Sequence, residues 1–406
     1  MNTAQRDIDL PSPLMTSESD SFARLTIVER KPQIIRQVIE DNNYPPEILQ
    51  ALETFRQEIA GRPIGLLEGQ SSDVAFWNRE LAAYRGKTWL QMPWYLAESF
   101  FYRCLLEAVR YFEPGPWKGH DPFGRRKRRQ ERIAVEWLAK NGRPLAVLEP
   151  KEGFETLLHS CLWGNRADLS NYTVRVEVQA GLQARQERCY ILVDHTQEVH
   201  ALLSGGLQRL DVVNDNAGLE LLFDLAMVDG FFRQGWVQKV VFHLKDRPFF
   251  VSDAMPQDIR ALISLLQGAS EAGTKKLGLR LHEYLAEKRL ILRTDPFWTT
   301  CLMFRRLTPP LRAELARSDL VVLKGDVNYR RLLDDRHWPP TTPLGDIAAY
   351  FPSPFVVLRT LKGEIVAGLK PGQAEAVAAQ DPTWLIDGQW GIIQLIDSHR
   401  AFKNAI

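Results

Sequence analysis

Apolar residues between about residues 32 and 163 recur at intervals of three and four, the spacing that places them on one face of an α-helix. The pattern predicts a helix that begins near Pro46, and longer helices over 96–112 and 125–140. We therefore predict a mainly helical subdomain over residues 21–185. The polar segment 1–20, rich in Ser, Asp, Pro and Thr, is expected to be disordered.

Beyond residue 186 the pattern changes to short apolar runs that contain many β-branched residues. The predicted strands are 189–193, 210–213, 236–243, 249–252, 320–323, 355–358 and 392–395. Helical stretches separate most of them, for example 218–228, 256–266 and 310–317. Buried strands that alternate with helices are typical of a mostly parallel sheet covered on both faces. The fold class predicted for residues 186–406 is an α/β, three-layer α/β/α Rossmann-like sandwich.

Charge and composition narrow the class of partner. Lys and Arg (51) nearly balance Asp and Glu (50), so no overall field attracts nucleic acid or an anionic membrane. No apolar run reaches the roughly 18 to 20 residues that span a bilayer, and the polar start does not resemble an export signal. The cysteines have no paired spacing. These features favour a cytoplasmic protein with a small-molecule ligand.

Chemically active side chains follow four of the predicted strands. Asp215 and Asn216 come after 210–213, Asp253 follows the 249–252 run, and residues 324–330 follow 320–323. After the strand 355–358 come Arg359, Thr360, Leu361 and Lys362. Because functional groups of open α/β sheets gather beyond the carboxyl ends of strands, these segments are expected to form one site.

The residue types in this predicted site suit a metal and a phosphate. Carboxylate and amide oxygens of Asp215, Asn216 and Asp253 are hard donors for Mg²⁺ or Mn²⁺ and leave positions for water and substrate. Lys362 and Arg359 supply positive charge for phosphoryl oxygens. Asn328 and backbone N–H groups after Gly325 offer neutral hydrogen bonds. Each segment alone is more typical of a turn or a helix cap, so the prediction rests on their occurring together.

Four other features are interpreted as structural or solvent-exposed rather than functional. The Gly-rich stretch 268–275 inverts the ending of a phosphate loop, and His195 and His200 are spaced too far apart for one helical face. The basic run 125–129 is interpreted as a solvated helix face, and Cys161 as a buried structural thiol.

Several motifs resemble those of a known family. The stretches LWGNRADLS (162–170), DNAGLEL (215–221), LKGDVNYR (323–330) and RTLK (359–362) are similar to signatures of the metal-dependent damage-control phosphatases. The last of these resembles the RTxK motif of the acidic-residue-methyltransferase-like subgroup. Pro93-Trp94-Tyr95 and the helix that follows add to the likeness, which spans residues 90–369.

The resemblance implies a helical subdomain packed on an α/β/α sandwich and an enzyme that hydrolyses small phosphomonoesters, typically sugar phosphates such as fructose 1-phosphate or fructose 6-phosphate. It implies Mn²⁺, Mg²⁺, Co²⁺ or Ni²⁺ as the cofactor, with Asp215, Asn216 and Asp253 as metal ligands. The substrate-binding residues that it implies are Asp215, Asn216, Asp326, Val327, Asn328, Tyr329, Arg330, Arg359 and Lys362.

The working hypothesis is a metal-dependent phosphatase with Asp253, Asp326 and Lys362 as catalytic residues. Either a metal-activated water attacks phosphorus with Asp253 or Asp326 assisting, or one of these carboxylates attacks directly. Two alternatives stay open: an S-adenosylmethionine-dependent carboxyl methyltransferase, weakened by the missing glycine-rich loop, and a non-catalytic protein that binds a partner through the helix 125–140. The sequence does not choose an oligomeric state.

Overall fold

One seven-stranded sheet forms the centre of the computed structural model, which describes residues 9–69, 71–141, 150–164 and 188–397. The strand order is β1-β7-β6-β5-β2-β3-β4. The strands are β1 (Ile191–Asp194), β2 (Leu207–Val213), β3 (Val237–Leu244), β4 (Leu290–Thr294), β5 (Leu320–Lys324), β6 (Phe355–Thr360) and β7 (Gly391–Ile396). The strands from β6 to β4 are parallel, whereas β7 runs antiparallel to β6 and parallel to β1.

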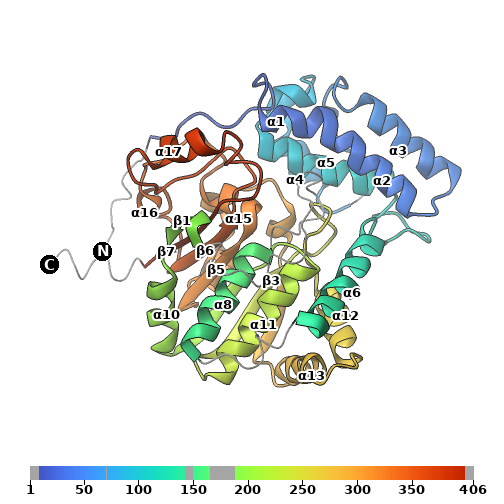
Figure 1. Ribbon diagram of the computed structural model, residues 1–406. Helices are drawn as coiled ribbons and strands as arrows, with labels where there is room; N and C mark the ends of the chain where they lie inside the picture. Colours follow the sequence, from blue (N-terminus) through green and yellow to red (C-terminus); the bar gives the residue numbers. More distant parts are fainter. Residues whose placement is uncertain (1–8, 70, 142–149, 165–187, 398–406) are drawn as a thin grey trace.

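Both faces of the sheet are apolar, because successive residues of a strand point to opposite sides. In β5, Val321 and Leu323 join one buried cluster, while Leu320 and Val322 join the other. The second cluster also contains side chains of α6 (Gly124–Asn141), α8 (Pro150–Trp163), α10 (Thr196–Ser204), α11 (Leu219–Arg233), α12 (Pro256–Gln267) and α13 (Ala272–Ala286). Figure 1 shows α8 and α11 crossing one face of the sheet.

The first cluster joins the opposite face of the sheet to the N-terminal helices, which lie together in the blue part of Figure 1. These helices are α1 (Phe22–Leu25), α2 (Lys31–Asp41), α3 (Pro46–Glu58), α4 (Val74–Glu80) and α5 (Trp94–Ala108). The same cluster includes side chains of α14 (Pro309–Leu315), α15 (Gly325–Leu332), α16 (Leu344–Ile347) and α17 (Gln373–Gln380). The predicted α/β sandwich is therefore confirmed.

Two details of the predicted sheet are wrong. Strand β4 was missed, because this edge strand is half exposed and carries the polar ending Arg293-Thr294. Residues 249–252, predicted as a strand, form a buried turn in which Phe250 and Val251 have left-handed backbone angles (φ 46° and 55°). Their apolar composition reflects burial among aromatic rings rather than strand pairing.

The division into a helical subdomain (21–185) and a sandwich (186–406) stays a prediction, since its boundary lies outside the described residues. The packing nevertheless differs from it at one point. Helices α6 and α8 precede the boundary, yet both pack against α11 of the sandwich, and α8 also contacts β6 and β7.

Residues 9–20 are built into the molecule, so the expectation of disorder is wrong for them. Leu14 and Thr16 are fully buried. Isolated bridges join Pro13 to Arg336 and Met15 to Pro93, and the Thr16 hydroxyl donates to the carbonyl of Met92 at 2.9 Å. These partners are distant in sequence, which is why local composition did not predict them. Residues 1–8 lie outside the described part of the chain.

Across the described ranges, no helix combines the length and the apolar character that crossing a membrane requires.

Candidate active site

The candidate site lies where the order of the sheet reverses. Strands β2 and β5 are neighbours, but the chain leaves them in opposite directions: β2 leads through α11 to β3, and β5 leads through α15 to β6. Helices α11 and α15 lie on opposite faces of the sheet. This reversal of strand order is a switch point, and in open α/β sheets ligands usually bind at the carboxyl ends of the strands that flank such a point.

Asp215, Asn216 and Asp253 lie at this switch point on two adjacent segments. Asn216 and Asp253 form an isolated antiparallel bridge. Main-chain hydrogen bonds flank it, from Ala254 N to Asp215 O (2.8 Å) and from Ala217 N to Ser252 O (2.7 Å). The Asn216 amide nitrogen donates to Asp215 Oδ2 at 2.9 Å, and its oxygen accepts from the Ser252 hydroxyl at 2.5 Å. The structure therefore brings together the three residues predicted as metal ligands.

Gly325 fits closely against Asp215. A Cβ at Gly325 would lie 1.8 Å from Asp215 Oδ2, and the φ angle of Gly325 is +78°, a region that other residues rarely adopt. Only glycine leaves room for the carboxylate here. The Gly325 position thus joins the end of β5 to the carboxylate that follows β2.

A buried polar network supports this edge of the sheet from beneath. The Asn216 amide nitrogen donates to Glu220 Oε2 at 2.9 Å. Lys324 Nζ lies 3.2 Å from Glu220 Oε1 and 2.8 Å from Asp224 Oδ1. Asn214 donates to Asp224 Oδ2 at 3.2 Å. Lys324, Glu220 and Asp224 are at most 2% exposed, so the network is shielded from bulk water.

Burial and charge act against each other in this network. Burial raises the pKa of Asp224 to about 6 despite the neighbouring Lys324. Burial lowers the pKa of Lys324, but Asp224 and Glu220 outweigh it, so the net shift is upward and the ammonium stays charged. Lys324 therefore anchors the first turns of α11 to the end of β5.

Lys245 holds Asp253 in place. Its ammonium lies 3.0 Å from Asp253 Oδ2 and donates to the carbonyl of Asn214 at 3.3 Å. Lys245 and Asp253 are both 1% exposed. This ion pair fixes the orientation of the Asp253 carboxylate.

The turn before Asp253 is under backbone strain. Two successive non-glycine residues, Phe250 and Val251, are left-handed. Such residues cost on the order of 1–3 kcal/mol each and persist when surrounding packing fixes them. The Phe250 ring packs with those of Tyr95 and Tyr102 on α5, at centroid distances of 6.2 and 5.0 Å. The N-terminal helices therefore help to place Asp253.

Asp326 lies between two guanidinium groups. Its Oδ2 accepts from Arg330 Nε and its Oδ1 from Arg359 Nε, both at 2.7 Å. Burial would raise the pKa of Asp326, but Arg359 and Arg330 outweigh it and hold the pKa well below its usual range. Asp326 therefore stays ionised near neutral pH and is poorly suited to accept a proton, which argues against its predicted role in deprotonating water.

The remaining residues predicted on α15 differ in exposure. Val327 is half-buried. The Asn328 amide nitrogen donates to the carbonyls of Lys324 (2.8 Å) and Val213 (3.3 Å), so it supports the junction of β2 with α15 rather than offering a donor to a ligand. Tyr329 is fully buried, and its hydroxyl accepts from the N–H of Ala367 at 3.0 Å.

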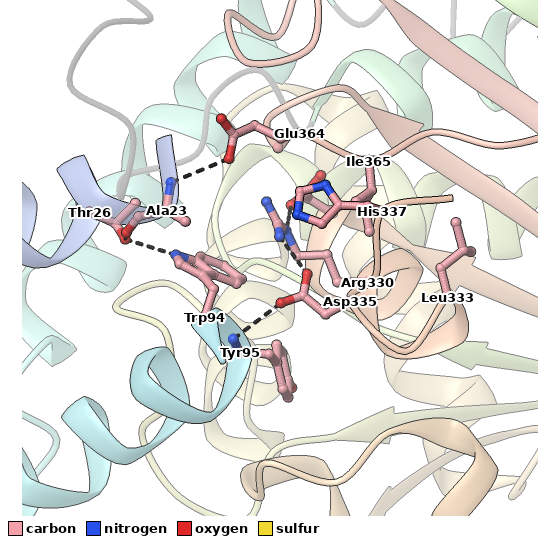
Figure 2. A network of polar contacts seen from close by, with 12 residues as sticks. Ala23, Thr26, Trp94, Tyr95, Arg330, Leu333, Asp335, His337, Glu364 and Ile365 are labelled. Atoms are coloured by element: carbon pink, nitrogen blue, oxygen red, sulfur yellow. Dashed lines mark hydrogen bonds and ion pairs between the residues drawn. The ribbon is translucent and has the colours of Figure 1, made fainter. Parts of the chain in front are cut away.

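Arg330 and Arg359 are turned into the protein. Arg330 also pairs with Asp335 at 2.6 Å, and its guanidinium lies 3.9 Å from the centre of the Trp94 ring. Figure 2 shows Arg330 between Trp94 and Asp335. Arg359 donates to the carbonyls of Ile365 (2.6 Å) and Gly363 (3.1 Å). Both arginines thus serve as internal supports in this structure.

Lys362 is the remaining positively charged residue of the predicted set. It follows β6 and is 7% exposed, at the start of the loop that Arg359 holds through Gly363 and Ile365. A Cβ at Gly363 would lie 1.8 Å from Arg330 Nη2, so this loop also packs directly on Arg330.

The basic run on α6 is not simply a solvated face. Lys127 is 1% exposed and pairs with Asp121 at 2.7 Å and Asp258 at 2.8 Å. One turn later, Glu131 is fully buried and neither carboxylate oxygen has a hydrogen-bond partner in the described chain. Burial raises the pKa of Glu131 to about 7, with a further contribution from Asp258.

The donor set suits a divalent cation that also takes oxygen from water or substrate. In the described part of the chain, no three His, Cys, Asp or Glu side chains gather as a metal cluster. Asp215 and Asp253 with the amide of Asn216 supply fewer protein ligands than a closed site, as is usual for Mg²⁺-type ions that bind phosphate. Glycine at position 325 leaves space for the Asp215 carboxylate, which is consistent with a metal-binding role for that carboxylate.

The supporting residues Lys245, Glu220 and Asp224 were not predicted. Glu220 and Asp224 lie on α11 and looked like ordinary polar positions of a helix, and Lys245 lies one residue beyond β3. The one local signal for Lys245 and Lys324 is a charged residue at the carboxyl end of an apolar strand, just beyond β3 for Lys245 and as the last residue of β5 for Lys324. Residues 165–170 of the first motif lie outside the described residues.

An α/β sandwich with acidic and amide side chains at its switch point is typical of enzymes that act on phosphorylated ligands with a divalent cation. The family model described as the damage-control phosphatase ARMT1-like domain matches residues 26–377, and the chain belongs to this family. Membership supports a phosphatase, and hence a hydrolase, with a house-cleaning role.

Individual relatives extend over nearly the whole chain. It is 32% identical to "Damage-control phosphatase ARMT1" of Xenopus tropicalis, over 96% of this chain and 100% of the relative. The protein of the same name from Homo sapiens is 30% identical, over 95% of this chain and 98% of the relative. A solved DUF89 family protein from Pyrococcus horikoshii is 14% identical, with a TM-score of 0.48, covering 90% of this chain and 95% of that one.

Proposed function

We propose that this chain is a metal-dependent phosphatase that hydrolyses small phosphomonoesters, with sugar phosphates such as fructose 1-phosphate or fructose 6-phosphate as the substrate class. The observation that carries the proposal is the meeting of Asp215, Asn216 and Asp253 beside Gly325 at the switch point. Family membership supports the phosphatase chemistry, and the donor set supports the metal.

In this proposal Asp215, Asn216 and Asp253 hold one divalent cation, Mn²⁺, Mg²⁺, Co²⁺ or Ni²⁺. The bound cation would supply positive charge for phosphoryl oxygens and lower the pKa of a water molecule. Lys245 fixes the Asp253 carboxylate through its 3.0 Å ion pair, and Glu220 fixes the Asn216 amide. Lys362 supplies a second positive charge for the substrate phosphate.

The two carboxylates considered for catalysis have different surroundings. Both oxygens of Asp326 accept from arginines, and its pKa is lowered. Asp326 therefore acts as a support for Arg330 and Arg359 in this proposal. Asp253 is then the carboxylate that orients the attacking water or attacks phosphorus itself.

A hydrolysis screen tests the function. Sugar phosphates are incubated with the full chain and Mg²⁺, Mn²⁺, Co²⁺ or Ni²⁺ in parallel, and phosphate release is measured with and without EDTA. We expect metal-stimulated release that EDTA abolishes. Metal-independent release, or no release from any phosphomonoester, would contradict the proposal.

The Asp253→Asn variant tests the assigned ligands. We expect it to lose at least about 100-fold in kcat/KM, because a charged ligand and a positioned carboxylate are removed. It should also lose the rise in melting temperature that Mn²⁺ gives the unmodified chain, a readout independent of turnover. Asp346→Asn, at an exposed position on α16, is the matched control and should behave like the unmodified chain.

A further inference from the structure

The N-terminal segment 11–25, which we call the strap, contacts two loops of the proposed substrate site. These are the loop that follows α15 and the loop that contains Lys362. Leu14 is fully buried between two main-chain hydrogen bonds, from its own N–H to Asp335 O at 2.9 Å and from Trp94 N–H to Leu14 O at 2.8 Å. The strap thus joins the loop after α15 to the start of α5. The Asp335 carboxylate adds bonds from Tyr95 N–H (3.2 Å) and Arg330 (2.6 Å), as Figure 2 shows.

The strap ends at α1, which meets the Lys362 loop through one side chain. Glu364 Oε1 accepts from the N–H of Phe22 at 2.9 Å, and Oε2 accepts from the N–H of Ala23 at 3.4 Å. Figure 2 shows Glu364 reaching the helix at Ala23. A carboxylate at the first turn of a helix satisfies N–H groups that lack partners within the helix.

Glu364 lies at the tip of a tight turn. The Ile365 N–H donates to the Gly363 carbonyl at 2.8 Å, a three-residue turn centred on Glu364. Arg359 donates to the carbonyls of Gly363 and Ile365 from inside the protein. The turn is therefore held on one side by Arg359 and on the other by α1, and Lys362 is the residue directly before it.

We propose that Glu364 is a positioning residue for Lys362, and that the strap acts with it as a clamp that sets the affinity for the substrate phosphate. This inference rests on the proposed function, because Lys362 is the phosphate-binding cation there. Glu364 itself touches no substrate. Its loss frees the tip of the turn and leaves Lys362 less well ordered, so that phosphate binding must order it.

Kinetics of Glu364 variants test the clamp. Hydrogen bonds to a charged group contribute more than neutral ones, so we expect Glu364→Ala to raise KM for fructose 1-phosphate, and Ki for inorganic phosphate, by about tenfold. The value of kcat and the Mn²⁺ concentration for half-maximal activity should change less than about twofold, because Asp215, Asn216 and Asp253 lie outside the clamp. Glu364→Gln, which keeps one acceptor, should fall in between.

A strap variant tests the same contact from the other side. Phe22→Pro removes the donating N–H, and proline is tolerated at the first residue of a helix whose preceding residue is extended, as Ser21 is (ψ 151°). It should raise KM like Glu364→Ala. Phe22→Ala, which keeps the N–H, controls for the lost ring, and Glu375→Ala, at an exposed position on α17, controls for a lost carboxylate.

Hydrogen exchange separates failure of the clamp from failure of the proposed function. In Glu364→Ala, the amides of residues 22–23 and 363–365 should exchange faster than in the unmodified chain, while those of 214–217 and 252–254 keep their protection. Unchanged exchange at 363–365, or an unchanged KM in an active enzyme, would overturn the clamp. If the unmodified chain released no phosphate from any ester, the proposed function would fall, and the exchange result would still decide whether Glu364 orders the turn.

Discussion

The two sides of the candidate site are built from different contacts. On the β2–β3 side, the amide of Asn216 donates to Asp215, and the ammonium of Lys245 pairs with Asp253. The arginine side is formed by Asp326, Arg330 and Arg359. Here the two guanidinium groups donate hydrogen bonds to both oxygens of the Asp326 carboxylate. Charge-assisted hydrogen bonds to both oxygens restrict the orientation of this carboxylate. The comparison teaches that charged residues predicted together for one site can have different structural roles: Asp326, Arg330 and Arg359 are bound to one another, whereas Asp215 and Asp253 are bound by residues outside the predicted set or by the neighbouring amide.

The largest expected effect comes from the contact that joins the two sides. Gly325→Ala places a Cβ where Asp215 Oδ2 now lies, so the carboxylate or the start of α15 must move. A displacement of about 1 Å in a catalytic site costs about 100-fold in rate, and we expect at least this loss in kcat/KM.

The control for this variant is Gly372→Ala. Gly372 has nearly the same φ angle (+77°), but an added Cβ would meet no atom within 4 Å. It shares the backbone strain without the clash, so its turnover should be unchanged. Equal losses in both variants would show that strain, rather than contact with Asp215, is responsible.

Breaking the network beneath the β2–β3 side should mainly affect stability. Lys324→Met leaves Glu220 and Asp224 buried without their cation, which costs about 3–5 kcal/mol in the free energy of unfolding. Urea denaturation measures the loss. Lys370→Met, at an exposed position, is the control and should lie within about 0.5 kcal/mol of the unmodified chain. A fully stable Lys324→Met would mean that the network is not a support.

The contribution of the arginine side to the free energy of unfolding should depend on pH in the acidic range. Because the folded-state pKa of Asp326 is lowered, its ion pairs stabilise the fold above the unfolded pKa and lose that effect as pH falls through the folded value. The free energy of unfolding of Asp326→Asn should therefore be lower than that of the unmodified chain by about 2–3 kcal/mol, and this difference should not change with pH above 5. The difference should narrow below about pH 4. A difference that narrowed between pH 6 and 8 would contradict the lowered pKa.

A smaller effect is expected at Glu131, which belongs to neither side. Its pKa is raised to about 7 by burial, so the folded chain holds a proton that the unfolded chain releases. Stability should fall as pH rises from the unfolded pKa through 7. Glu131→Gln cannot lose a proton, so its stability relative to the unmodified chain should improve by about 1–3 kcal/mol between pH 4.5 and 8. Thermal melts across this range measure the trend, and a flat difference would refute it.

That the residues of the candidate site lie close together could be predicted from the sequence, because their positions depend on strand ends. Asp215 and Asn216 directly follow an apolar strand, and the parallel order places that strand beside β5. The division of roles could not be predicted, since Arg330 and Arg359 have the same formal charge as Lys362. Their roles depend on long-range contacts, such as Arg330 with Trp94, which no local pattern records.

The same reason explains the errors in the predicted elements. Phe249 to Val251 have the composition of a strand, but rings from α5 hold them in a left-handed turn. Leu14 lies in a polar segment, yet its peptide group bonds to Asp335 and Trp94. In each case contacts with distant residues outweighed local preference.

The contact between Phe22 and Glu364 spans 342 positions of the sequence. The strap is therefore synthesised well before its partner Glu364. At synthesis rates of about 5–20 residues per second, roughly 17 to 70 s separate the two. During this interval the N–H groups at the start of α1 lack the Glu364 carboxylate, so this contact forms only after the segments around Asp215 and Asp253 have been made.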